Sequence, residues 1–326
     1  MSDTVLSVNN LCTYFYTSDG VVKAVDDISF SVKNGKTFAL VGESGSGKSV
    51  TSFSITGLVA SPGKIVSGEI LLNGRDLSKL GGKKMRSVMG KEVSMVFQEP
   101  MTSLNPVLTV GEQIAEVFKL HLSLNKKDSR EKAIEMIRMV GIPQADMIYG
   151  NYPHQLSGGM RQRVMIAIAL SCNPDLLIAD EPTTALDVTI QAQILELMDE
   201  LIRKRKKSMI LITHDLGVVA ESADEVMVMY AGKAMEKTSV SNLFSKPLHP
   251  YTVCLLASLP DMNNIRKKLY SIPGTVPNLL YLPRGCPFSP RCPIADEHCV
   301  NEKPPFREAA PDHFVSCHKS GQRVLP

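Results

Sequence analysis

The feature that most constrains this chain is the octapeptide Gly42-Glu43-Ser44-Gly45-Ser46-Gly47-Lys48-Ser49, which fits the pattern G-x-x-x-x-G-K-[ST] throughout. Apolar residues 37–41 before it predict a buried strand, and residues 50–58 after it predict a helix. The glycines let backbone N–H groups turn toward phosphate oxygens, and the helix N-terminus adds partial positive charge. Lys48 can reach the β- and γ-phosphates, and the Ser49 hydroxyl can ligate Mg²⁺. A chance glycine-rich turn would lack this setting, so the chain is predicted to bind a nucleoside triphosphate.

Length and composition limit the remaining possibilities. A chain of 326 residues favours two domains, and a net charge of +3 is too small to indicate nucleic acid or a membrane surface as a partner. The basic run 203–207 follows a predicted helix. Cations are favourable at a helix C-terminus, so a solvated turn explains this run without a nucleic-acid partner. We find neither a run of about 18 apolar residues nor a secretory signal, so we expect a cytosolic chain that reaches a membrane only through a partner.

The periodicity of the chain changes several times. From about 109 to 170 it is helical, and helices are also predicted at about 188–202 and 217–222. Strands are predicted in the segments 6–11, 22–25, 28–32, 37–41, 68–74, 92–97, 176–179, 209–212 and 226–230. Alternation of strands and helices indicates a parallel sheet with helices on both faces. Past about 235, prolines accumulate and periodicity fades, so we expect one domain over 1–235 and a loop-rich extension over 236–326.

Two carboxylates follow a second apolar strand, Leu176-Leu177-Ile178-Ala179-Asp180-Glu181. Open α/β sheets bind ligands at the carboxyl ends of their strands, where Asp180 would lie. Asp180 is predicted to hold Mg²⁺, through water, and Glu181 to orient or deprotonate the attacking water. The alternative is that the pair only caps the following turn.

The heptapeptide Leu156-Ser157-Gly158-Gly159-Met160-Arg161-Gln162 stands before an apolar helix predicted over 164–170. Here the chain resembles the ATP-binding cassette (ABC) family, whose LSGGQ-type signature usually has glutamine where Met160 stands. A plain helix-capping loop is the alternative. The resemblance implies that Ser157 and the Gly158 and Gly159 amides close over ATP bound by another subunit, so that the active unit is a dimer.

The resemblance extends to further residues, in the family's order. Gln98 resembles the glutamine that senses Mg²⁺, His214 the switch histidine that contacts the γ-phosphate, and 184–187 the D-loop. One aromatic residue should stack on adenine, and Phe15 is favoured over Tyr16, with Tyr14 also in reach. The family implies an α/β fold: a P-loop NTPase (RecA-like) parallel-sheet core with an N-terminal antiparallel β subdomain and an inserted α-helical subdomain at about 100–170.

Longer segments, among them 97–106, 152–163, 247–252 and 284–292, resemble the dipeptide/oligopeptide importer branch. That implies membrane-spanning permease subunits, a second ABC ATPase (a sister chain in a heterodimer) and, indirectly, an extracytoplasmic solute-binding protein. The chain would then lie on the cytoplasmic face of the membrane. Importers of nickel or other small solutes share the branch. A soluble ABC ATPase acting on nucleic acid or ribosomes, and a regulatory module without turnover, are the other functions considered.

Four of the seven cysteines lie close together in the extension: Cys286, Cys292, Cys299 and Cys317. Zinc sites usually contain a C-x2–4-C pair, which this spacing lacks, and wider loops suit a [4Fe–4S] cluster with one cysteine for each iron. Peptide-importer ATPases of this type carry such a cluster, so the resemblance also implies it. Zn²⁺ and four unligated thiols remain alternatives. His298, His313 or His318 could replace a cysteine, and a structural role is expected because little else would hold the extension.

Overall fold

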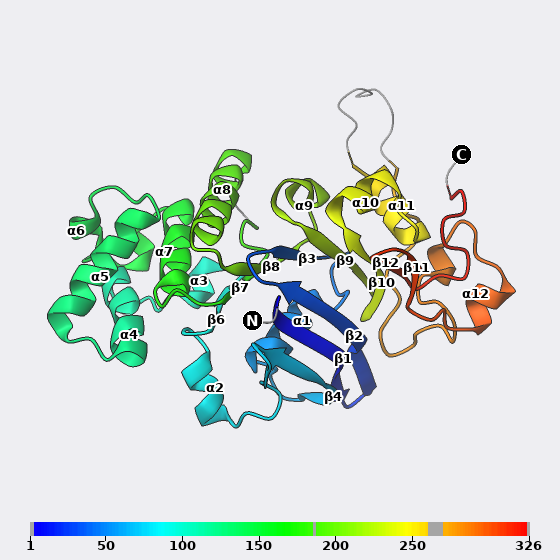
Figure 1. Ribbon diagram of the computed structural model, residues 1–326, viewed down its shortest axis with the longest axis horizontal. Coiled ribbons are helices and arrows are strands. Elements are labelled where there is room, and N and C mark those ends of the chain that lie inside the picture. The colour runs from blue at the N-terminus through cyan, green and yellow to red at the C-terminus, as the bar shows by residue number, and fades with distance from the viewer. Residues whose placement is uncertain (1–2, 185–186, 260–269, 325–326) are drawn as a thin grey trace. The chain divides into compact units, whose positions relative to one another are not determined.

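The computed structural model describes residues 3–184, 187–259 and 270–324 (Figure 1). It divides into two compact units. The first unit comprises Met1–Leu6, Ser31–Lys36 and Leu71–Ile212, and the second comprises Ser7–Phe30, Thr37–Ile70 and Thr213–Pro326. Among the described residues, no helix is both long and apolar enough to cross a membrane.

Three parallel strands form the sheet of the first unit. β7 (Leu176–Asp180) pairs on one side with β6 (Val93–Val96) and on the other with β8 (Ser208–Thr213). All residues of these strands are buried, which matches their continuous apolar sequences. The short strand β5 (Arg75–Asp76) pairs with the end of β4 (Gly63–Leu72).

Most helices of the first unit lie on one side of this sheet, as Figure 1 shows for α4 (Val110–Leu122), α5 (Lys126–Met139), α6 (Ala145–Ile148) and α7 (Gly158–Leu170). Thr109 and Glu112 form a capping box that fixes the start of α4, and the Asn125 side chain caps α5. The helices are α2 (Gly82–Val88), α3 (Pro100–Ser103), α4 (Val110–Leu122), α5 (Lys126–Met139), α6 (Ala145–Ile148), η1 (Pro153–Gln155), α7 (Gly158–Leu170) and α8 (Val188–Lys204).

Two long strands, β1 (Thr4–Thr17) and β2 (Gly20–Lys33), form the N-terminal sheet with β4, in the order β2-β1-β4. The sequence pattern predicts only 6–11 of β1 and divides β2 into 22–25 and 28–32. The reason is an irregularity at Asn10 and Asp27, which both have positive φ and whose side chains hydrogen-bond at 2.8 Å. This local change of backbone interrupts the alternation without ending the strands.

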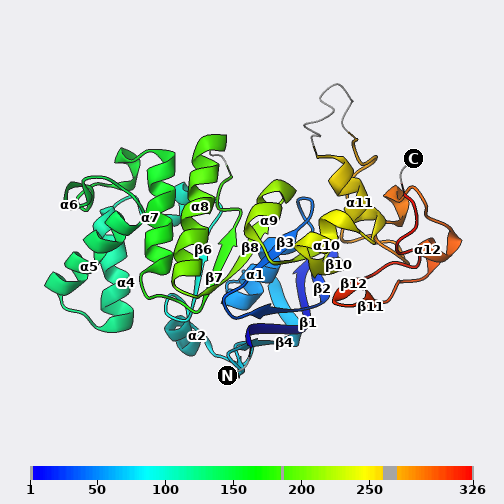
Figure 2. The ribbon, with the colours of Figure 1, turned by 45° about the horizontal axis from the view of Figure 1, so that its top comes forward.

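A second sheet of the second unit begins with β3 (Thr37–Val41), which pairs in parallel with β9 (Glu225–Tyr230). Its further strands, β10 (Lys233–Ser239), β12 (His313–Val315) and β11 (Arg307–Ala310), are added antiparallel in that order. The helices of the unit are α1 (Lys48–Thr56), α9 (Leu216–Ser222), α10 (Val240–Ser245), α11 (Pro250–Ala257), η2 (Ser289–Arg291) and α12 (Glu297–Asn301). Figures 1 and 2 both place α10 and α11 beside β10.

The C-terminal extension is better anchored than its sequence suggests. Phe288 is fully buried and packs against the rings of Tyr230 and Tyr251. The buried Glu236 carboxylate accepts hydrogen bonds from the backbone N–H groups of Leu248 (2.7 Å) and His249 (2.9 Å), and it contacts His313 Nε2 at 2.6 Å. The expectation that little besides cysteine ligation holds the extension is therefore wrong.

Candidate functional site

The predicted phosphate-binding loop connects β3 to α1 in the second unit, and α1 begins at Lys48, two residues earlier than predicted. Gly42, Gly45 and Gly47 all have positive φ, between 77° and 152°. A Cβ atom at Gly42 would lie 2.2 Å from the Met229 carbonyl oxygen, and one at Gly47 would lie 2.3 Å from that of Ala24. The loop therefore requires glycine at both positions, for conformation and for space.

The Lys48 side chain folds back over this loop and is 5% exposed. Its Nζ donates to the carbonyl oxygens of Gly42 (2.8 Å) and Glu43 (3.1 Å), and Ser46 Oγ lies at 3.5 Å. Ser49 follows in the first turn of α1. A cation, a hydroxyl and the N-terminus of a helix thus lie together, which suits them to a phosphate chain.

The two carboxylates lie in the first unit at the carboxyl end of β7, as predicted. Asp180 is buried, whereas Glu181 is half-buried and has a positive φ of 45°. Glu181 Oε2 accepts hydrogen bonds from Gln98 Nε2 (2.9 Å) and Thr184 Oγ1 (3.0 Å). Gln98 comes from the end of the neighbouring strand β6, so parallel pairing brings the two residues together. The sequence predicted a D-loop at 184–187 but not the contact of Thr184 with Glu181. Ala185 and Leu186 of that segment lie outside the described residues.

The signature residues begin α7 in the first unit. Ser157 is exposed, and its hydroxyl caps the helix by accepting from the Met160 N–H at 3.3 Å. Gly158 and Gly159 form the first turn. A Cβ atom at Gly159 would lie 2.9 Å from Ile190 Cγ2 of α8, which explains the need for a residue without a side chain. The result is an exposed helix N-terminus.

The remaining predicted residues lie in the second unit. His214 is exposed directly after β8. On β1, Phe15 is half-buried and packs near Gly63, whereas Tyr16 is 47% exposed. The Tyr14 hydroxyl donates to Asp26 at 2.7 Å, which engages that side chain. The choice between Phe15 and Tyr16 as the adenine-stacking residue stays a prediction.

Cys286, Cys292, Cys299 and Cys317 line one small cavity in the second unit, together with His249 and His318. All four are free thiols, and three are buried. Burial raises the pKa of Cys286 to about 12 and that of Cys317 to about 11, and nearby thiols contribute to both shifts. Of the three predicted alternative ligands only His318 lines the cavity, since His313 contacts Glu236 and His298 lies outside it. Within the described part of the chain, no three His, Cys, Asp or Glu side chains are arranged to hold a single metal ion.

Comparison with known proteins identifies the family. Residues 25–184 match the model of the ABC transporter family, and residues 235–299 match the oligopeptide/dipeptide transporter C-terminal region. The oligopeptide transport ATP-binding protein AppD of Bacillus subtilis is 55% identical over 98% of this chain and 95% of its own length. The chain belongs to the ATP-binding proteins of the oligopeptide/dipeptide ABC transporters.

Other relatives agree with this assignment. The dipeptide transport ATP-binding protein DppD of Escherichia coli is 49% identical, with 96% of each chain covered. A dimeric post-hydrolysis structure of the ATP-binding cassette MJ0796 with ADP and Pi matches with a TM-score of 0.65 and 25% identity, over 72% of this chain and 98% of that one. CbiO1 of Clostridium perfringens, from the ABC transporter complex cbiONQ, matches with a TM-score of 0.63 and 28% identity, over 75% and 92%. The predicted family, fold class and ATPase activity are confirmed.

In this peptide-transporter ATPase, the C-terminal extension contacts the P-loop directly. The Arg291 side chain is 6% exposed, and its Nη1 pairs with both carboxylate oxygens of Glu43, at 3.0 and 3.1 Å. It also donates to the Pro273 carbonyl (2.9 Å) and to the Tyr230 hydroxyl (3.2 Å). The Tyr251 hydroxyl accepts from the Glu43 N–H at 3.0 Å. Sequence reasoning missed the contacts of Glu43 with Arg291 and Tyr251 because they join residues more than 200 positions apart.

We expect Arg291→Lys to weaken ATP binding about threefold to tenfold, because lysine keeps the charge but has no second nitrogen to donate to the Pro273 carbonyl while its charge faces Glu43. Titration with a fluorescent ATP analogue measures the change. Arg307→Lys, an exposed change on β11, is the matched control and should leave the affinity unaltered. Unchanged ATP affinity in Arg291→Lys would show that Glu43 is positioned without this ion pair.

Proposed function

We propose that Glu181 is the catalytic base of this peptide-importer ATPase, and that ATP hydrolysis drives uptake through separate membrane-spanning permease subunits. Relatives that are 48–55% identical over nearly the whole chain are named as oligopeptide or dipeptide transport ATP-binding proteins. The observation that carries the catalytic part is Glu181, placed at the end of a buried strand and held by Gln98 and Thr184. A carboxylate fixed in this way is suited to orient and deprotonate water.

The nucleotide-binding roles follow from the chemistry of each side chain. Lys48 neutralises the β- and γ-phosphates, the P-loop amides bind their oxygens, and His214 contacts the γ-phosphate. Mg²⁺ prefers oxygen ligands, and Ser49, Gln98 and Asp180 offer a hydroxyl, an amide and a carboxylate oxygen. The ion would neutralise charge on the phosphates. Phe15 or Tyr16 provides the ring for adenine.

The signature residues act on a nucleotide held by another subunit. Ser157, Gly158 and Gly159 form an exposed helix N-terminus, which suits a phosphate presented from outside the chain. We infer that the partner is a sister ATPase in a heterodimer at the cytoplasmic face of the membrane, with a solute-binding protein on the other side. The domain boundary at 235/236, with a helical subdomain at about 100–170, is part of this proposal.

Uptake of labelled peptides by a strain lacking this gene tests the substrate. Dipeptide and oligopeptide uptake should fall to background and return with the wild-type gene, but not with Glu181→Gln. Labelled nickel serves as the competing cargo. Normal peptide uptake together with lost nickel uptake would overturn the peptide assignment and leave the ATPase role intact.

We further propose that the four-cysteine cavity holds a [4Fe–4S] cluster with a structural role. Four thiols lining one cavity match a cofactor that requires one thiolate for each of four irons, and His249 adds a buried Nε2 atom without a hydrogen-bond partner in the described part of the chain. The raised pKa values of Cys286 and Cys317 mean that these thiols ionise only where positive charge compensates their burial. Zn²⁺ is the alternative occupant of this cavity.

Protein purified without oxygen should be brown and contain iron and acid-labile sulfide at about four each per chain. Cys292→Ser should bleach it and expose the segment beyond about residue 270 to protease, because cluster binding stabilises the surrounding fold. Cys172→Ser, which changes a cysteine in the first unit, is the matched control and should stay brown. Stoichiometric zinc without sulfide would overturn the cluster and assign the cavity to a single ion.

A further inference from the structure

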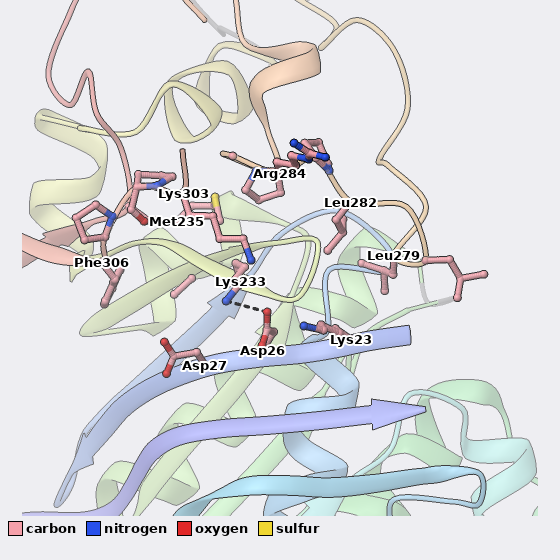
Figure 3. Close-up of a pocket in the computed structure, with 18 of the residues that line it drawn as sticks. Lys23, Asp26, Asp27, Lys233, Met235, Leu279, Leu282, Arg284, Lys303 and Phe306 are labelled. Carbon is pink, nitrogen blue, oxygen red and sulfur yellow. Dashed lines mark hydrogen bonds and ion pairs between the residues drawn. The ribbon is translucent and has the colours of Figure 1, made fainter. Parts of the chain in front are cut away.

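A second cavity, of about 620 Å³, lies in the second unit. Residues of β2 and β10 form its floor, and the segments 279–287 and 303–306 of the C-terminal extension form its walls (Figure 3). The volume is in the range of small-molecule sites. None of the nucleotide-binding residues described above lines it.

The charges around this cavity are unbalanced. Asp26 is engaged by the Tyr14 hydroxyl (2.7 Å) and by Lys233 (2.9 Å), and Asp27 accepts from Asn10 Nδ2 (2.8 Å). The cavity also has three further cations: Lys23, which lies over the Tyr14 ring, and the exposed Arg284 and Lys303. Within the described residues, Arg284 and Lys303 have no ion pair or hydrogen bond from their side chains. The cavity therefore offers uncompensated positive charge to an anion.

Apolar side chains supply the rest of the lining. Leu279 and Leu282 lie on the same side of the cavity as Arg284, while Met235 and Phe306 lie on the other side with Lys303 (Figure 3). Phe306 is 38% exposed, and its ring stacks on that of Phe314. Two separate apolar walls suit branched side chains on a short backbone better than one straight alkyl chain. Prolines at 283, 287, 304 and 305 stiffen both walls.

We propose that this cavity binds an organic carboxylate with an apolar body, and that the ligand is a short apolar peptide with a free C-terminal carboxylate. The positive charge of Arg284, Lys303 and Lys23 around the cavity attracts the carboxylate, and the leucine, methionine and phenylalanine side chains cover the apolar part. Fatty acids share the same chemistry, a carboxylate on an apolar body, and the experiment below separates the two sources.

The cavity has a direct connection to the P-loop. The carbonyl oxygen of Ala24, beside the cavity residue Lys23, leaves no room for a side chain at Gly47. The Gly232 N–H, beside Lys233, donates to the Ser46 carbonyl at 3.0 Å, and the Asp26 N–H donates to the Gly232 carbonyl at 2.9 Å. A ligand in the cavity that orders these strands should also affect the loop that binds phosphate. The cavity ligand and ATP should therefore alter each other's affinity reciprocally.

The sequence contains no tryptophan, so Phe306→Trp in the full chain gives a single reporter at the cavity. Trileucine should change its fluorescence saturably, whereas trileucine amide should bind at least about tenfold more weakly because it lacks the carboxylate. Calorimetry on the unmodified chain repeats both titrations without the reporter. The double variant Arg284→Glu and Lys303→Glu should lower trileucine affinity by about tenfold or more, whereas Lys84→Glu, an exposed change in the first unit, should not.

Five results decide the inference. Saturable binding of dodecanoate but not trileucine would assign the same chemistry to a fatty acid and overturn the peptide. Equal affinity for trileucine and its amide, no effect of the double charge reversal, or no saturable binding of either trileucine or dodecanoate would overturn the site. If saturating trileucine leaves the ATP affinity unchanged, the connection to the P-loop is wrong and the site stands alone.

Discussion

Replacing Glu181 with glutamine should lower ATP turnover by about two orders of magnitude or more while leaving ATP binding intact. Glutamine has the same shape, and its Oε1 can still accept hydrogen bonds from Gln98 and Thr184, which bind Glu181 Oε2 at 2.9 and 3.0 Å. The local fold should therefore persist. What is lost is the negative charge and the ability to take a proton from water.

Phosphate release measures the turnover of this variant, a fluorescent nucleotide measures its affinity, and gel filtration with MgATP should show an accumulated closed dimer. Glu92→Gln, which alters a glutamate that directly precedes β6 and pairs with Arg75, is the control and should hydrolyse ATP normally. Near-normal hydrolysis by Glu181→Gln would remove Glu181 from the role of base.

Replacing Ser157 with arginine should abolish ATP-dependent dimerisation and leave ATP binding by the isolated chain nearly unchanged. Ser157 is exposed at the start of α7, so the larger side chain projects from the chain without disturbing a core. Lys48 and Ser49, which hold the nucleotide of the same chain in our proposal, are untouched. Bulk and charge would block the partner's nucleotide from the signature.

The serine hydroxyl also caps α7 by accepting from the Met160 N–H, and loss of a cap costs about 1 kcal/mol. Ser157→Ala therefore serves as the matched control: it removes the cap without adding bulk and should still dimerise. Analytical ultracentrifugation with and without MgATP separates the two variants. Loss of ATP binding by the Ser157→Arg monomer would show that the residue acts on its own chain's nucleotide.

The sequence by itself determined the elements whose geometry is local. The strand predicted at 37–41 is β3 to the residue, and those predicted at 176–179 and 209–212 are β7 and β8 with one or two residues added. These strands are buried on both faces, so their apolar runs are continuous and bounded by polar residues. The P-loop and the start of α7 could be predicted from the sequence, because their glycines meet requirements of conformation and close packing that few other sequences satisfy.

Only the tertiary structure decided which distant residues meet. It joins Glu43 to Arg291, adds β12 and β11 to the edge of β10, and brings Gln98 to Glu181. It also gathers four cysteines, spread over about thirty positions, around one cavity. Such contacts depend on strand order and on the path of proline-rich loops, where side-chain periodicity carries no signal. A local pattern fixes backbone conformation over a few residues, but pairing between remote segments is set by how the whole chain packs its core.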